Sequence, residues 1–223
     1  MSKRVLILVE GQTEERFVKD VLGPAFLSRQ LFITPTLLVT KRVKNGPNFK
    51  GGVTTFGKFQ NDAKRLLSRP GGALVTTLLD YYGLPADFPG MKNRPNVSAV
   101  QRVTHVERAI AESFGAPDNF IPFLALHEFE AWLFSSPAVL PEVMSEMNKM
   151  QDFTSICESV ASPEDINERT EYAPSKRIKT LFPAYRKNLY GPTTANRIGL
   201  DRIRSKCPHF DAWISRLEAF ASA

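Results

Sequence analysis

The feature that most constrains this chain is a set of short apolar runs that each lead into an acidic residue. The first run, Val5–Val9, has no polar break and is followed by Glu10. The run Ala73–Leu79 is followed by Asp80, and Phe120–Leu126 is followed closely by two further acids. Continuous apolar runs of this length are typical of strands buried on both faces, as in parallel sheets. We therefore predict a mainly parallel sheet.

Helical patterns separate these apolar runs. Thr13 is a candidate N-cap for the helix after the first run, and helical patterns also cover residues 59–68 and 97–114. Strands that alternate with helices predict parallel strands joined by right-handed crossovers, which is a Rossmann-like α/β fold flanked by helices. We expect this α/β core to cover residues 1–140. Residues 141–223 are expected to form a helical C-terminal extension packed on the core.

The acids at the strand ends are candidates for a shared site. Parallel strands bring their carboxyl ends to one edge of the sheet, where open α/β folds bind ligands. Glu10, Asp80 and either Glu128 or Glu130 are expected to converge there. Two carboxylates about 4 Å apart repel by roughly 4 kcal/mol at an effective dielectric of 20, so the cluster needs a cation or protons. Hard oxygen ligands favour Mg²⁺ or Mn²⁺, either of which can bind phosphate and activate water.

Each acid also has a purely structural interpretation. Glu10 could end its strand in solvent, and Asp80 could cap a turn. Glu128 and Glu130 flank Phe129 and should point in different directions on a helix, so one of them could be a helix-start charge. The segment HEFEA does not match the zinc-protease motif HExxH, because its fifth residue is alanine.

The stretch Lys41–Lys58 is a basic loop with five glycines or prolines and five lysines or arginines. It is either a solvated loop or an arm that contacts phosphates. The segment Gly52–Lys58 fits the spacing of a P-loop, but Phe59 stands where the magnesium-binding Ser or Thr belongs, which argues against a nucleotide triphosphatase. The net charge of +6 also fits a polyanionic partner. The predicted nucleic-acid contacts are Lys41, Arg42, Lys44, Lys50, Lys58, Lys176 and Arg177.

Composition limits the classes of protein to which this chain can belong. A hydrophobic fraction of 43% is enough for a sizeable core. The two cysteines, Cys157 and Cys207, give neither a disulfide framework nor a zinc pattern, so we expect a reducing cytoplasm. The sequence starts directly with a strand pattern and contains no apolar run long enough to span a bilayer. A cytoplasmic protein without a membrane partner is therefore expected.

Three segments carry a resemblance to known families: EGQTEE at 10–15, LLDYYGLP at 78–85 and HEFEAWLF at 127–134. Their order of strand–Glu, strand–Asp and strand–acid resembles the Toprim fold of topoisomerases, primases and OLD-type nucleases. The chain more closely resembles the Toprim-like family called domain of unknown function 4276. This second resemblance extends through SPEDINE, APSKR and CPHFDAWI, and so covers most of the chain.

The Toprim resemblance implies roles for two of the acids. In Toprim proteins the first-strand glutamate is a metal ligand or general acid/base, and Glu10 matches it. The second Toprim motif is Asp-x-Asp; Asp80 matches its first aspartate, whereas Tyr82 stands at its second. The implied metal site is therefore completed by Glu128 or Glu130, holds a single ion, or is degraded. The resemblance also implies a genomic context of ATPases and phage-defence regions.

These observations lead to three functional hypotheses. The first is a Mg²⁺- or Mn²⁺-dependent Toprim-type nuclease acting on DNA or RNA, in phage defence with an ATPase partner. Its predicted catalytic residues are Glu10, Asp80 and Glu128, and its predicted metal ligands are these three and Glu130. The second is a non-catalytic nucleic-acid- or partner-binding module that regulates an ATPase. The third is a metal-dependent phosphohydrolase acting on small substrates.

Overall fold

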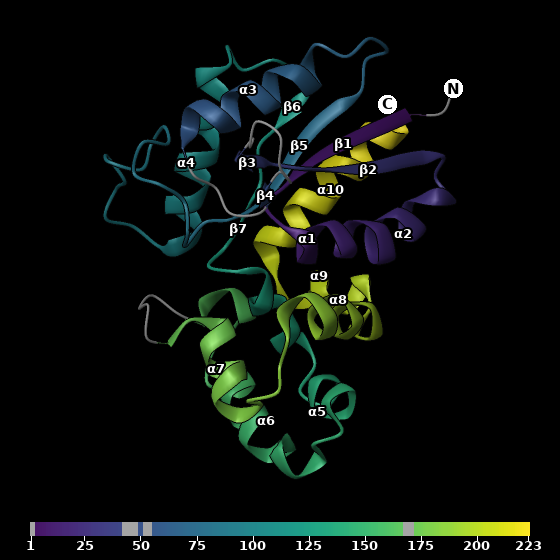
Figure 1. Ribbon diagram of the computed structural model, residues 1–223, viewed down its shortest axis with the longest axis vertical. Coiled ribbons are helices and arrows are strands. Elements are labelled where there is room, and N and C mark those ends of the chain that lie inside the picture. The colour runs from purple at the N-terminus through teal and green to yellow at the C-terminus, as the bar shows by residue number, and fades with distance from the viewer. Residues whose placement is uncertain (1–2, 42–48, 51–54, 167–171) are drawn as a thin grey trace.

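The computed structural model describes residues 3–41, 49–50, 55–166 and 172–223, with the backbone alone at 39–41 and 49–50 (Figure 1). The strands are β1 Lys3–Val9, β2 Leu31–Leu37, β3 Val39–Lys41, β4 Phe49–Lys50, β5 Leu74–Asp80, β6 Phe120–Ile121 and β7 Leu124–Ala125. The α-helices are α1 Gln12–Phe17, α2 Gly23–Leu27, α3 Phe56–Leu67, α4 Ala99–Ser113, α5 Val139–Met144, α6 Met150–Glu158, α7 Pro174–Leu181, α8 Lys187–Ile198, α9 Leu200–Lys206 and α10 Pro208–Ser222. A π-helical segment, η1 Val18–Leu22, joins α1 to α2, and the 3₁₀ segments are η2 Phe129–Ser135, η3 Met147–Lys149 and η4 Pro163–Asp165.

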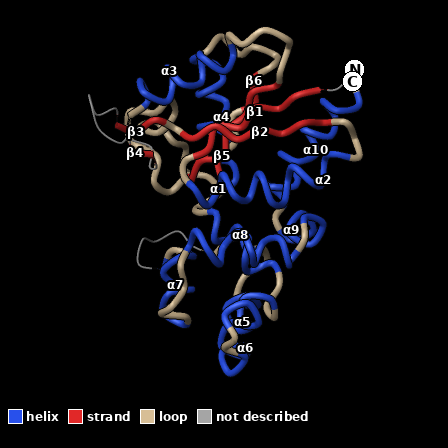
Figure 2. The backbone as a smooth tube through the Cα atoms, turned by 45° about the vertical axis from the view of Figure 1, so that its right-hand side comes forward, coloured by secondary structure: helices blue, strands red, loops and turns tan. Residues whose placement is uncertain are grey.

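The main sheet has the order β2-β1-β5-β6, with β7 pairing the end of β5, and all of these pairings are parallel (Figure 2). This confirms the predicted α/β class with a mainly parallel sheet, flanking helices and a helical C-terminal part. Pro35 lies on β2, an edge strand of the sheet, where a residue without an N–H is tolerated. The separate β3–β4 pair is antiparallel.

The predicted third apolar strand is split into β6 and β7. The break falls at Pro122, which has no N–H to donate to a neighbouring strand. At this point the Thr77 side chain of β5 takes the place of the missing backbone hydrogen bonds. Its Oγ1 accepts a hydrogen bond from Phe123 N at 2.8 Å and donates one to Phe123 O at 2.6 Å. A side chain therefore connects the two short strands to β5.

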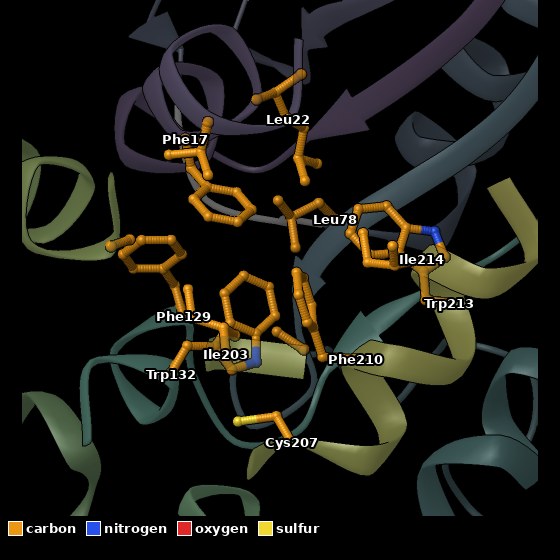
Figure 3. Close-up of a cluster of buried hydrophobic side chains, with 14 of the residues drawn as sticks. Phe17, Leu22, Leu78, Phe129, Trp132, Ile203, Cys207, Phe210, Trp213 and Ile214 are labelled. Carbon is orange, nitrogen blue, oxygen red and sulfur yellow. The ribbon is translucent and has the colours of Figure 1, made fainter. Parts of the chain in front are cut away.

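Each face of the sheet has its own hydrophobic core, because alternate side chains of β1 and β5 point to opposite faces. Leu6, Leu8 and Leu79 pack beneath α3 and α4. The opposite face carries Ile7 and Leu78, which pack with side chains of α1, η1, η2 and α10 (Figure 3). The second core continues into the helices that follow β7, so the sheet and the C-terminal helices share buried surface.

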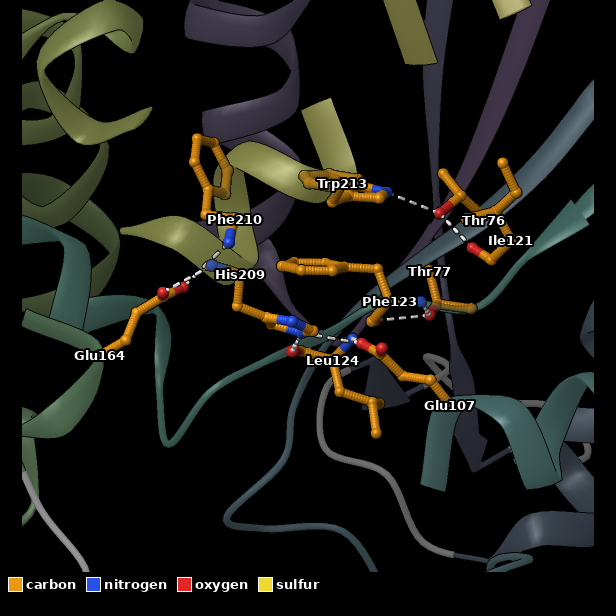
Figure 4. Close-up of polar contacts among 10 residues, drawn as sticks. All are labelled: Thr76, Thr77, Glu107, Ile121, Phe123, Leu124, Glu164, His209, Phe210 and Trp213. Atoms are coloured by element: carbon orange, nitrogen blue, oxygen red, sulfur yellow. Dashed lines mark hydrogen bonds and ion pairs between the residues drawn. The ribbon is translucent and has the colours of Figure 1, made fainter. Parts of the chain in front are cut away.

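The last helix returns to the sheet after the chain has formed α5–α9 at one end of the molecule (Figure 1). The Trp213 ring of α10 stacks on Phe123 with ring centroids 4.2 Å apart, and its Nε1 donates to Thr76 Oγ1 at 2.9 Å (Figure 4). Buried Glu164 accepts hydrogen bonds from the backbone N–H groups of His209 and Phe210 at 2.8 and 3.0 Å. The division of the chain at residue 140 remains our proposal.

One local expectation was wrong. Thr13 does not cap the first helix: the N-cap is Gly11, and Thr13 is buried inside the first turn. The chain stays helical through Gly23 and Pro24, which follow the π-helical segment η1 and begin α2. Among the described residues, no helix is long and apolar enough to cross a membrane.

Candidate active site

Glu10 and Asp80 lie side by side at the carboxyl edge of the sheet. The parallel register places Val9 of β1 beside Leu78 of β5, so the acids that follow are neighbours. Glu10 N donates to Leu78 O at 3.3 Å, and Glu10 Oε2 accepts a hydrogen bond from Asp80 N at 3.1 Å. The structure therefore brings together the two acids that the strand-end pattern paired.

Lys187, the first residue of α8, lies among the carboxylates. Its Nζ is 3.1 Å from Glu130 Oε2, 3.2 Å from Asp80 Oδ2 and 3.5 Å from Glu14 Oε1. The side chains of Glu130 and Glu14 are 0% and 4% exposed, whereas that of Lys187 is 36% exposed. We call Glu10, Glu14, Asp80, Glu130 and Lys187 the carboxylate cluster. Glu14 and Glu130 form its buried part, whereas Glu10 and Lys187 are partly exposed.

Gly191 permits α8 to approach the cluster closely. A Cβ at this position would lie 3.1 Å from both Phe129 Cε1 and the Tyr185 hydroxyl, and 3.5 Å from Thr13 Cγ2. Lys187 precedes Gly191 by four residues, so the two lie on the same side of the helix. The absence of a side chain at Gly191 therefore allows the close packing of α8 from which the Lys187 ammonium contacts the carboxylates.

Asp80 and Glu128 both hold backbone groups of neighbouring segments. Asp80 Oδ1 accepts a hydrogen bond from Phe129 N at 3.0 Å, while its Oδ2 contacts Lys187. Glu128 Oε2 accepts a hydrogen bond from Ser175 N at 2.9 Å, in the first turn of α7. Phe129 is fully buried against Phe17. Glu128 therefore binds α7, and the acid beside Lys187 is Glu130; a catalytic role for Glu128 stays a prediction.

The cluster carries more acidic groups than one ammonium can neutralise. Burial, and then the charge of Asp80, raise the pKa of Glu10 to about 8. Burial raises the pKa of Glu130 to about 7 although Lys187 opposes the shift, and burial and Asp80 also raise the pKa of Glu14. Burial acts to lower the pKa of Lys187, but the charges of Asp80, Glu130 and Glu14 outweigh it and keep the amine protonated.

The donor set suits a hard divalent cation in its chemistry and charge. All of its acidic groups are carboxylates, and Glu130 Oε1 has no hydrogen-bond partner among the described residues. Burial, and then the charge of Asp80, raise the pKa of Glu10, and a bound divalent cation would lower that pKa again. In the described ranges, however, no group of three or more His, Cys, Asp or Glu side chains is arranged to hold a metal ion. Lys187 instead lies between three of the carboxylates.

The predicted basic contacts are spread over several segments. Arg42 and Lys44 lie outside the described residues, and only the backbones of Lys41 in β3 and Lys50 in β4 are described. Lys58 is exposed on α3. Lys176 and Arg177 follow directly after Ser175 in α7, which Glu128 binds. Lys176 is exposed, and the Arg177 guanidinium lies over the Tyr172 ring at 5.5 Å.

Sequence reasoning missed Glu14, Tyr185 and Lys187. Glu14 lies in the first turn of α1, where an acidic residue is common, so its type and position do not distinguish it as a site residue. A Cβ at Gly191, one turn from Lys187, would lie 3.1 Å from the Tyr185 hydroxyl, so this phenol is close to the cluster. Burial, and then the charge of Glu130, raise the pKa of the Tyr185 hydroxyl. Lys187 is 107 residues from Asp80, and no local pattern distinguishes it from other surface lysines.

Comparisons with known proteins give one family and one solved structure. The family described as "Domain of unknown function (DUF4276)" matches residues 9–218. No curated protein matches the chain. The C-terminal region of the Xanthomonas campestris pv. campestris OLD protein is similar at 16% identity and a TM-score of 0.40, covering 97% of this chain and 98% of that one. The match over residues 9–218 confirms the resemblance drawn from the sequence motifs: the chain belongs to the DUF4276 family.

Proposed function

We propose that this chain is a Mg²⁺- or Mn²⁺-dependent nuclease of Toprim type that hydrolyses phosphodiester bonds. The observation that carries the proposal is the carboxylate cluster at the carboxyl edge of a parallel sheet. Ligands bind at this edge in open α/β folds. The order of the acids along the chain also matches the Toprim pattern at Glu10 and Asp80. Nucleic acid is the proposed substrate, and an ATPase is the proposed partner in phage defence.

Glu10 and Asp80 are the residues that would hold the cation. A bound divalent ion supplies charge neutralisation at phosphate oxygens and a more acidic water. Glu10 would take up or release a proton, since a pKa of about 8 lies close to the working pH of such a group. Lys187 would direct its ammonium toward the negative charge of the phosphate. Lys58, together with the pair Lys176–Arg177, would hold the nucleic-acid backbone.

Lys187 also supports the alternative hypothesis of a non-catalytic binding module. Its ammonium already contacts three carboxylates and offsets part of their charge. With this ammonium and with Glu10 protonated, the acidic edge needs no metal, and the chain would then bind nucleic acid or an ATPase partner without cleaving it. The two hypotheses differ in whether metal-dependent turnover exists.

A cleavage assay with a matched pair of variants tests the nuclease proposal. Labelled DNA and RNA, single-stranded and duplex, are incubated with Mn²⁺ and wild type, Asp80→Asn or Glu112→Gln. The Asn Oδ1 can still accept from Phe129 N, so the fold is kept while a charged ligand is lost. We expect Asp80→Asn to lose about a hundredfold or more of the activity. Glu112 is 64% exposed on α4, so Glu112→Gln should match wild type.

Cleavage by Asp80→Asn at the wild-type rate would reject the site assignment. Salt-sensitive binding of DNA or RNA by folded wild type without cleavage under any of these conditions would favour the binding module. Turnover of nucleotides without cleavage of polymers would instead indicate a phosphohydrolase that acts on small substrates.

A further inference from the structure

The loops that follow β5 and β7 at the carboxyl edge of the sheet also line a pocket that is separate from the carboxylate cluster. It has a volume of about 410 Å³, and the described residues that line it include Tyr81, Tyr82, Met91, Arg94, Arg102 and His127. The two tyrosines follow Asp80 in the chain, and His127 precedes Glu128. Tyr81 N donates to Ala125 O at 3.0 Å, and Tyr82 N donates to His127 O at 3.1 Å. The loops after β5 and β7 therefore build both the pocket and the cluster.

The wall of this pocket is cationic and aromatic, with no acidic side chain among the described lining residues. Arg94 Nε donates to Met91 O at 3.0 Å, and Arg94 Nη1 donates to the Tyr81 hydroxyl at 3.3 Å. The guanidinium also lies 5.9 Å from the centre of the Tyr81 ring. All of these partners are neutral, so they fix the guanidinium without compensating its charge. Such a group suits a phosphate, which it can bind through two N–H groups.

Two further lining residues, Arg102 and Tyr82, indicate a ligand that is larger than a phosphate. Arg102, in the first turn of α4, donates from Nη1 to Val97 O at 2.5 Å, which holds its guanidinium near the helix start. Tyr82 is 40% exposed, so one large aromatic surface is accessible at the pocket. Aromatic side chains stack on nucleobases, and arginine guanidinium groups bind the adjoining phosphates.

We propose that this pocket binds one unpaired nucleotide of a single-stranded nucleic acid. The phosphate lies at Arg94 and Arg102, and the base packs against Tyr82. The inference rests on the proposed nuclease function, because the carboxylate cluster at the same edge of the sheet would receive a phosphodiester of the same strand. The volume is within the range of small-ligand sites, roughly 300–1,000 Å³. A paired base would first have to leave the duplex stack, at a cost of a few kcal/mol, so the pocket selects unpaired strands.

Binding is measured by fluorescence polarisation in EDTA, so that no cleavage is required. The probes are a short labelled single strand and the duplex of the same sequence, titrated with wild type, Arg94→Gln, Tyr82→Ala and Tyr82→Phe. Arg108→Gln is the matched control, since Arg108 is on the same helix as Arg102, is 70% exposed and pairs with Glu112. We expect the single strand to bind more tightly than the duplex. Arg94→Gln and Tyr82→Ala should each weaken single-strand binding about tenfold, whereas Tyr82→Phe and Arg108→Gln should not.

Competition by an unlabelled mononucleotide and by inorganic phosphate separates a nucleotide site from an anion site. We expect the mononucleotide to displace the single strand at concentrations where phosphate does not. Equal displacement by phosphate would overturn the proposal, as would equal affinity for duplex and single strand, or Arg94→Gln and Tyr82→Ala binding as tightly as Arg108→Gln. Because these assays contain no metal, a failed cleavage assay would reject the nuclease and leave the result for the pocket unchanged.

Discussion

At the scale of single residues, Lys187 determines how much negative charge the carboxylate cluster can hold. Its Nζ lies within 3.5 Å of an oxygen of Glu14, Asp80 and Glu130. Within the described residues, no second lysine or arginine forms an ion pair with these three acids. Glu14 and Glu130, which contact this ammonium, and Glu10, which is hydrogen-bonded to Asp80 N, all have raised pKa values. Removing it should therefore disturb both the stability and the titration of the cluster.

Lys187→Met is predicted to destabilise the protein by roughly 1–3 kcal/mol at pH 8. Breaking a fully buried ion pair costs about 3–5 kcal/mol, and the 36% exposure of the Lys187 side chain reduces that figure. The loss should be smaller at pH 6, because carboxylates deprived of the ammonium take up protons instead. Urea unfolding at both pH values measures it, with exposed Lys64→Met as the control. An equal loss at both pH values would contradict this account.

Some site residues can be predicted from local sequence, whereas others reach the site only through tertiary packing. Glu10 and Asp80 each end an apolar strand, so local sequence and the geometry of parallel sheets were enough to pair them. Glu130 was a candidate together with Glu128, but the sequence did not show that Glu128 binds the start of α7. Lys187 reaches the site only through the packing of α8, which is set by tertiary contacts far away in the chain.

At the scale of elements, α8 is placed by its contact with α1 and η2. Gly191, Thr194 and Ala195 are buried, and these small residues let the backbone of α8 pack closely. The helix also includes Pro192 in its interior, where the missing N–H leaves the carbonyl of Asn188 without its helical donor; that carbonyl accepts a hydrogen bond from Arg16 Nη1 at 2.8 Å instead. The position of Lys187 therefore depends on a residue one turn away that has no side chain.

Gly191→Ala is predicted to destabilise the protein by about 1 kcal/mol. Overpacking at 3.1 Å from two neighbours costs roughly 1–3 kcal/mol, which outweighs the helix-propensity gain of about 1 kcal/mol. Gly57→Ala in α3 is the matched control, because a Cβ there meets nothing within 4 Å and should be neutral or slightly stabilising. Chemical unfolding of both variants measures the change in unfolding free energy. A Gly191→Ala protein as stable as Gly57→Ala would show that α8 does not depend on this contact.

Helices and strands were predictable where a single sequence signal sets the structure, and not where two signals in the same segment favour different structures. The apolar runs identified β1 and β5, which are buried along nearly their whole length. The run over 120–126 is similarly apolar, but Pro122 divides it into two short strands. The Thr77 side chain of β5 forms the hydrogen bonds to Phe123 that a continuous strand would form with its backbone. Thr13 has the chemistry of a cap, yet Gly11 is the N-cap and Thr13 packs inside.

At the scale of the whole molecule, a polar network links α10 to the sheet, to α4 and to η4 (Figure 4). His209 Nε2 lies 3.0 Å from Glu107 Oε1 of α4 and 3.2 Å from Leu124 O of β7. Glu164 binds the first N–H groups of the same helix. Burial acts to lower the pKa of His209, but the hydrogen bond and charge of Glu107 raise it further, so the net shift is upward.

The stability that His209 provides should therefore decrease with rising pH. Because its pKa is higher in the folded chain than in the unfolded one, its contribution is complete below the unfolded value near 6.5 and is lost as the pH rises through the folded value. The difference in unfolding free energy between wild type and His209→Gln should shrink from pH 6 to pH 9. Urea unfolding across this range measures it, with His105→Gln as control, and a difference that grows with pH would refute the assignment.

The measurement that tests the central claim most directly is calorimetric titration of Mn²⁺ into wild type, Glu10→Gln, Asp80→Asn and the exposed control Glu112→Gln. We predict saturable binding to wild type and to the control, and its loss in the two site variants. Titration at pH 7 in buffers of different ionisation enthalpy should also show proton release, since Glu10, with a pKa of about 8, must lose its proton to bind metal. Absence of binding to folded wild type, or unchanged binding in both site variants, would contradict the account.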